Sequence, residues 1–129
     1  MGRTVQSTPA VVAGRRTKAM QFATAAEMIA ALADDAVEVA DAYVTLLVHA
    51  GIAAADVMCC IRLGEHAAGD SHNDAVALLN KIDKACGKAL GTLLAAKTKA
   101  GYGAATVSYD DRVRCERACA RLIDGISAL

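Results

Sequence analysis

The residue most out of keeping with its surroundings is Asp56, which lies within the most apolar stretch of the chain, from Tyr43 to Ile61. A carboxylate there needs a hydrogen-bonding or charged partner, or its pKa must rise so that it stays neutral. His49 lies seven residues earlier, on the same face if the segment is helical, and Cys60 follows one turn later. Two interpretations stay open: a polar pocket on this helix, or a structural carboxylate bonded to a hydroxyl or a lysine from another helix.

Three further residues are candidates to share a site with Asp56. His72 stands at the start of an expected helix, and Lys97 and Tyr102 stand near the end of the next one. The plainer interpretations are a partly exposed histidine and a lysine favoured by the dipole of a helix C-terminus. We predict a ligand site lined by Asp56, His72, Lys97 and Tyr102. No residue is assigned as catalytic, although the last three are the candidates.

The five cysteines do not have the spacing of a metal site. They form an adjacent pair, a pair one helical turn apart and a single residue: Cys59 and Cys60, Cys115 and Cys119, and Cys86. Zinc sites use four ligands in tight paired spacings, so we predict no metal. No phosphate-binding glycine loop or nucleophile elbow occurs, and we predict no cofactor. The odd count, without the pattern of a signal peptide, favours reduced thiols in the cytoplasm.

The charge balance argues against a protein that binds nucleic acid phosphates without regard to sequence. Basic and acidic residues number 14 each, whereas such proteins usually carry a basic excess. Two basic stripes are more typical of solvated helix faces: Arg114, Arg117 and Arg121, and Lys81, Lys84 and Lys88. The charges are also segregated, because all those before residue 20 are basic and all those from 20 to 61 are acidic. This favours paired helices within the fold, or docking of opposite charges in an oligomer.

The elements that must position these residues are helices, because alanine dominates the apolar residues and proline occurs once. We predict a flexible N-terminus over 1–8 and a single domain over 9–129. The expected fold is all-α, an antiparallel up-and-down bundle of about five helices with little room for a sheet. The helix over 35–65 should be central in the bundle or buried at a dimer interface, because it is apolar on nearly all sides between Tyr43 and Ile61. We expect a break near Cys86–Gly87 and a left-handed stop at Gly101 and Gly103. No uncharged apolar run reaches the length of a membrane span, because the run from Ala42 to Ala55 is too short and is followed by Asp56.

Two stretches resemble the HEPN family, the small helical domains named for higher eukaryotes and prokaryotes nucleotide-binding proteins. The first reads HAGIAAADVMCCIRLGEHAAGDSHNDAVALL, from His49 to Leu79, and the second reads LLAAKTKAGYGAATVSYDDRVRCERACARLI, from Leu93 to Ile123. Together they cover about half the chain, in the family's order of long helix, short helix, helix ending in a basic–Tyr loop, and alanine-rich last helix. The resemblance implies a four- to five-helix bundle that forms a homodimer through its central helices.

The chain departs from the catalytic signature of that family, an arginine followed after four to six residues by a histidine. The corresponding segment reads Lys97-Thr-Lys-Ala-Gly-Tyr102. Arg62 and His66 have only three residues between them and lie at the end of a different helix. Tyrosine titrates near pH 10 and is a poor general base at neutral pH. The resemblance therefore implies binding or scaffolding rather than cleavage.

These observations lead to three hypotheses for a soluble, cytoplasmic protein without a membrane partner. The first is a dimeric, non-catalytic HEPN-like module that binds a nucleotide, RNA or a protein. A nucleotidyltransferase is one candidate partner, because many members are RNases or toxins encoded beside a minimal one. The second is a metal-independent RNase or toxin with an altered site, in which Lys97 stabilises charge and His72 or Tyr102 transfers protons. The third is a purely structural bundle whose apolar stripe from Tyr43 to Ile61 is an interface.

Overall fold

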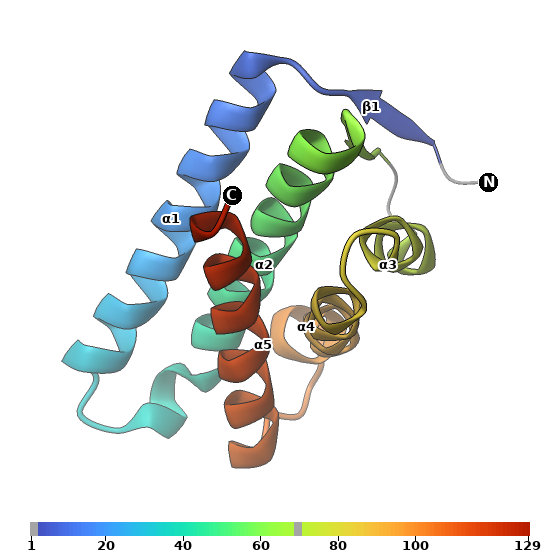
Figure 1. Ribbon diagram of the computed structural model, residues 1–129. Helices are drawn as coiled ribbons and strands as arrows, with labels where there is room; N and C mark the ends of the chain where they lie inside the picture. Colours follow the sequence, from blue (N-terminus) through green and yellow to red (C-terminus); the bar gives the residue numbers. More distant parts are fainter. Residues whose placement is uncertain (1–2, 69–70) are drawn as a thin grey trace.

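The computed structural model describes residues 3–68 and 71–129, and within these ranges it contains five α-helices, one of which is central to the bundle (Figure 1). The helices are Pro9–Leu32 (α1), Ala40–Leu63 (α2), His72–Asn80 (α3), Lys84–Tyr102 (α4) and Tyr109–Ser127 (α5). A short 3-10 helix, Ala36–Val39 (η1), leads into α2, and two strands, Thr4–Gln6 (β1) and Glu65–Ala67 (β2), complete the elements. Helices α1, α4 and α5 pack on α2, and α3 packs on α4. The predicted helical bundle with a long central helix is confirmed.

Helix α2 is central because it carries apolar side chains on all its faces, and most of them are small. More than half of its residues are buried, among them Ala50, Gly51 and Ala54, which let neighbouring helices approach closely. The segment Ala36–Leu63 contains an 18-residue window with a mean hydropathy of 2.0 and is long and apolar enough to cross a membrane. In this fold 67% of its most apolar window is buried inside the bundle, as expected for the core helix of a soluble protein.

Side chains cap the starts of several helices, whereas two of the predicted helix ends are wrong. The side chains of Thr8, Ser71 and Ser108 each accept a hydrogen bond from the first turn of the helix that follows. The break predicted near Cys86–Gly87 is wrong: the chain turns before Asp83, whose carboxylate accepts a hydrogen bond from the Cys86 amide. Cys86 therefore lies in the first turn of α4.

The left-handed stop predicted at Gly101 and Gly103 is also wrong. Gly103 leaves α4 with φ −69° and ψ 153°, so the chain continues in an extended conformation. That exit carries it to Val107, whose amide donates to the Asp41 carboxylate at the start of α2 at 2.9 Å. Among the described residues, the glycine with a left-handed conformation is Gly64, with φ 76°, and it ends α2.

A two-stranded ribbon is the element that the composition did not predict. Strand β1 pairs antiparallel with β2, with Thr4 opposite Ala67 and Gln6 opposite Glu65. The turn at Gly64 redirects the chain out of α2, so β2 presents a free edge to which residues 4–6 add. This part of the segment expected to be flexible is thus a regular strand. Residues 1–2 of that segment and 69–70 of the turn before α3 lie outside the described residues.

The tight packing around α2 gives a prediction for Gly51. A Cβ at this position would overlap the Cδ1 of Leu93, which is fully buried, and would lie 3.2 Å from the Cδ1 of Leu122. Overpacking costs about 1–3 kcal/mol and exceeds the roughly 1 kcal/mol that alanine contributes over glycine in a helix. Gly51→Ala should therefore lower the free energy of unfolding, measured by urea denaturation, by about 1 kcal/mol.

Gly14 in α1 provides the matched control, because a Cβ there meets no atom within 4 Å. Gly14→Ala should raise the free energy of unfolding by up to about 1 kcal/mol. Equal stabilisation by both substitutions would show that Leu93 has room to move and that the core around α2 is loosely packed.

Candidate functional site

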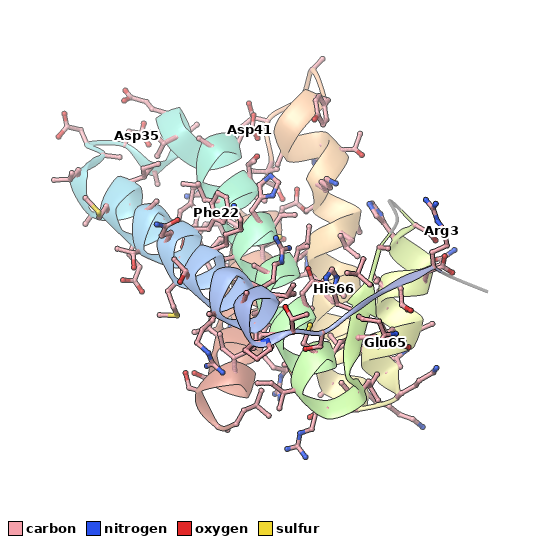
Figure 2. The ribbon with its side chains drawn as sticks, turned by 90° about the horizontal axis from the view of Figure 1, so that it is seen from above. Arg3, Phe22, Asp35, Asp41, Glu65 and His66 are labelled. Atoms are coloured by element: carbon pink, nitrogen blue, oxygen red, sulfur yellow. The ribbon has the colours of Figure 1, made fainter. Side chains whose placement is uncertain are left out.

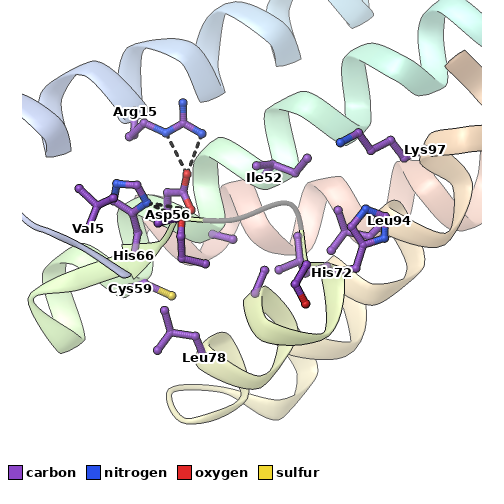
Figure 3. A pocket seen from close by; sticks show the side chains of 16 residues that line it. Val5, Arg15, Ile52, Asp56, Cys59, His66, His72, Leu78, Leu94 and Lys97 are labelled. Atoms are coloured by element: carbon purple, nitrogen blue, oxygen red, sulfur yellow. Dashed lines mark hydrogen bonds and ion pairs between the residues drawn. The ribbon is translucent and has the colours of Figure 1, made fainter. Parts of the chain in front are cut away.

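A cavity of about 330 Å³ opens where α2 meets α1, α3, α4 and the ribbon (Figure 3). Its apolar lining comes mainly from aliphatic side chains of three helices: Ile52, Leu78, Leu90 and Leu94. Its polar lining comes from five elements and the cap of α3: Arg15, Asp56, His66, Ser71, His72 and Lys97. Charged and apolar surfaces therefore meet in one cavity, which is the usual composition of a small-molecule site.

Asp56 is held in the cavity wall by Arg15 of α1. Its Oδ2 accepts hydrogen bonds from Nε and Nη2 of Arg15 at 3.0 and 2.7 Å. The Nδ1 of His66 in β2 lies 3.8 Å from the other carboxylate oxygen, Oδ1. Burial raises the pKa of the Asp56 carboxyl above its ordinary value, and the charges of Arg15 and His66 oppose that rise.

The pair of Arg15 and Asp56 resolves the question left open by the sequence. Asp56 is a structural carboxylate with a partner on another helix, but the partner is an arginine rather than a hydroxyl or a lysine. It also lines the cavity, so the two interpretations describe the same residue. The segregated charges of the sequence meet here, because a basic residue of α1 pairs with an acidic residue of α2.

His72 and Lys97 stand across the cavity from Arg15 and His66 (Figure 3). His72 is the first residue of α3, and Lys97 lies on α4 more than one turn before its end. Within residues 3–68 and 71–129 neither side chain forms an ion pair. The charge of Lys97 also affects the pKa of His49, whose ring stacks on that of Phe22 of α1 at 5.2 Å between ring centroids. Burial lowers the pKa of His49, and the charge of Lys97 lowers it further.

Tyr102 lies outside the cavity. It is the last residue of α4 and its side chain is 84% exposed. Tyr102 is five positions after Lys97, and at about 100° per residue the two side chains therefore point to different sides of the helix. The structure thus gathers Asp56, His72 and Lys97 around one cavity and leaves Tyr102 apart. Ligand binding by the first three stays a prediction.

Sequence reasoning missed two residues of the cavity, Arg15 and His66. The segregation of charge pointed to a basic partner for Asp56 but did not say which of the early basic residues it was. His66 was considered only as the second half of an Arg–His motif, because the strand that positions it was not expected. Its Nδ1 lies 2.9 Å from the carbonyl oxygen of Ala67, which can only accept, so this nitrogen carries the hydrogen.

The cysteines do not add a nucleophile to the cavity. All five are free and buried, and Cys59 is the one that lines the cavity. Burial raises the pKa of the Cys59 thiol to about 12, and the Asp56 carboxylate adds to the rise. Such a thiol stays protonated at neutral pH and is a poor nucleophile and metal ligand.

Comparison of the chain with protein-family models, with curated proteins and with solved structures gives no match. The function of the protein must therefore be inferred from the cavity and from the residue patterns of the chain.

Replacing Arg15 should destabilise the protein in a pH-dependent way. Arg15→Met leaves the Asp56 carboxylate without its charged partner in a part-buried site, which costs about 2 kcal/mol at pH 7. The variant loses an interaction that lowers the pKa of Asp56, so that pKa rises further above the unfolded value. Protonated Asp56 needs no counter-charge, so the deficit should shrink as the pH falls through the folded-state pKa.

Urea denaturation at pH 7 and at pH 4.5 would measure this change, with Arg62→Met at the exposed end of α2 as the control. A deficit for Arg15→Met that is the same at both pH values would mean that Arg15 acts through packing alone and not through the charge of Asp56.

Proposed function

We propose that this protein binds a small organic anion the size of a mononucleotide in the cavity and does not transform it. The observation that carries the proposal is the placement of Lys97 and His72 opposite the Arg15–Asp56 pair, around an apolar lining. An anionic group would lie against the basic side chains, and the body of the ligand would lie on the aliphatic ones.

The dimensions of the cavity support a compact ligand. Its volume of about 330 Å³ is at the lower end of the range for small-molecule sites, roughly 300–1,000 Å³. A mononucleotide has two parts that match this lining. Its flat base would pack on Ile52 and Leu94, and its phosphate would pair with the Lys97 ammonium group. The zero net charge of the chain also supports a small ligand over a long RNA strand, which needs a broad basic surface.

Asp56 does not oppose an anionic ligand, because Arg15 neutralises it. Only its Oδ2 accepts from Arg15, and Oδ1 remains able to accept a hydrogen bond from a donor such as the amino group of a base. The pair would then fix the neutral end of the ligand while Lys97 binds the charged end. This division of roles favours a nucleotide over a simple fatty acid.

A relation to the HEPN family remains part of the proposal, supported by the order of the helices and by the two stretches quoted above. A homodimer is likewise proposed, as are RNA or a nucleotidyltransferase as further partners. In this chain Val48 and Val57 of α2 are covered by the neighbouring helices. We therefore infer that any pairing of two copies uses outer helices rather than the buried faces of α2.

Calorimetric titration with adenosine monophosphate, guanosine monophosphate and adenosine tests the proposal. A charged hydrogen bond is worth about 1.5–3 kcal/mol, so Lys97→Ala should weaken binding of the nucleotide roughly 10- to 100-fold. Lys88→Ala, on the exposed side of the same helix, is the matched control and should leave the affinity unchanged. Equal binding of adenosine and its monophosphate would contradict the role given to Lys97, and no heat with any of the three would refute the nucleotide.

A metal-independent RNase or toxin is the second candidate, favoured by one observation. His66 and His72 line the same cavity as Lys97, and two imidazoles with a cation can supply acid–base catalysis and charge stabilisation. Labelled RNA on a denaturing gel separates the two functions. Under the leading proposal the RNA stays intact. Cleavage that falls about 10²–10⁴-fold in His72→Ala, but not in Tyr102→Phe, would establish the nuclease instead.

A further inference from the structure

A second concave surface lies on the face of α2 opposite the cavity. Helices α1 and α5 both pack on α2 but diverge from each other, as Figure 1 shows, and they leave a groove of about 380 Å³ between them. At one end they are joined by Arg16, whose Nη1 donates to the carbonyl of Ile126 at 3.3 Å. Tyr43 and Leu47 form the floor, more than a quarter turn around α2 from Ile52 and Asp56.

The walls of the groove are mostly apolar. They are built largely from small or flexible side chains of α1 and α5: Met20, Ala23, Ala26, Ala120 and Ile123. Methionine adapts its shape to a partner, and alanine lets another backbone approach closely. Outside the groove, Met28, Leu32 and Val37 are further exposed apolar residues, with side chains 57%, 79% and 61% exposed.

The charges of the groove are all of one sign. Glu27 of α1 and Glu116 and Asp124 of α5 line it, and the part of its lining that the structure describes contains no lysine or arginine. The floor itself is uncharged at neutral pH, and burial, with Glu116 nearby, raises the pKa of Tyr43 still further, to about 12. An occupant would therefore present apolar side chains to the floor and cations to both edges.

A second copy of this chain fits that description poorly. Two copies related by a two-fold axis through the groove would bring Glu27 and Glu116 of each against acidic residues of the other. An added helix fits better, because a channel between two diverging helices accepts a third at the usual 8–10 Å between axes. We propose that the groove between α1 and α5 is a docking site for a basic amphipathic helix of a partner protein.

Two labelled 18-residue peptides test this inference by fluorescence anisotropy. Both carry one leucine stripe at helical spacing, flanked in one by lysines and in the other by glutamates. The lysine peptide should bind at least tenfold more tightly, and added salt should narrow the difference. Ala120→Arg should weaken its binding at least tenfold, whereas Ala85→Arg, an exposed alanine at the start of α4, should have no effect. The charge-reversed variant Glu27→Lys/Glu116→Lys should prefer the glutamate peptide.

Equal affinity for the two peptides, or binding that Ala120→Arg leaves unchanged, would overturn the proposal. So would the absence of binding by either peptide in protein that circular dichroism shows to be folded. A dimer in light scattering that dissociates in Ala120→Arg would assign the groove to a second copy instead. The nucleotide proposal concerns the other side of α2, so none of these outcomes decides it.

Discussion

The need to bury α2 on every side is the constraint from which the rest of the structure follows. A helix with apolar residues all around cannot rest on a single neighbour, so α1, α4 and α5 must each cover part of its surface. Three helices placed around a fourth leave furrows between them wherever their axes diverge. The cavity beside Asp56 and the groove over Tyr43 are two such furrows, on different faces of the same helix.

Asp56 shows how a charge is accommodated within that constraint. A carboxylate facing the interior is costly unless it is paired, and Arg15 supplies the pair from α1, a helix that carries three of the four basic residues before residue 20. Figure 2 shows from above the N-terminal strand and the labelled His66, which lies opposite Val5 in the paired strand β2. The same contact that makes the carboxylate tolerable therefore ties α1 to α2 and forms one wall of the cavity.

Most of the fold could be predicted from the sequence, because alanine content, caps and spacing of apolar residues act locally. Thr8, Ser71 and Ser108 mark helix starts in the sequence and in the structure alike. The start of α4 after Asp83 was missed, because the break between the two helices was predicted a few residues later, near Cys86–Gly87. The ribbon was missed because its pairing joins residues 59 to 63 positions apart, for which a local pattern holds no signal.

The cavity was predictable only in part, for a related reason. Asp56 was chosen as a charge in an apolar segment, and His72 and Lys97 as residues near expected helix ends, and the fold brings the three together. Tyr102 was chosen beside Lys97 near the end of the same helix, and the rotation of α4 directs it to solvent instead. Arg15 and His66 could not be chosen, because their importance depends on which helix lies beside α2 and on a strand that begins only after Gly64 turns the chain.

The buried thiols have a practical consequence for studying both surfaces. Cys59 lies at the wall of the cavity and Cys119 in the lining of the groove, and they are only 3% and 4% exposed. Each thiol would react with an alkylating reagent mainly when the structure around it opens. Anything that fills one furrow should slow the alkylation of its own cysteine more than that of the other. The unmodified chain thus carries a separate reporter of occupancy for each side of α2, readable by mass spectrometry without an added label.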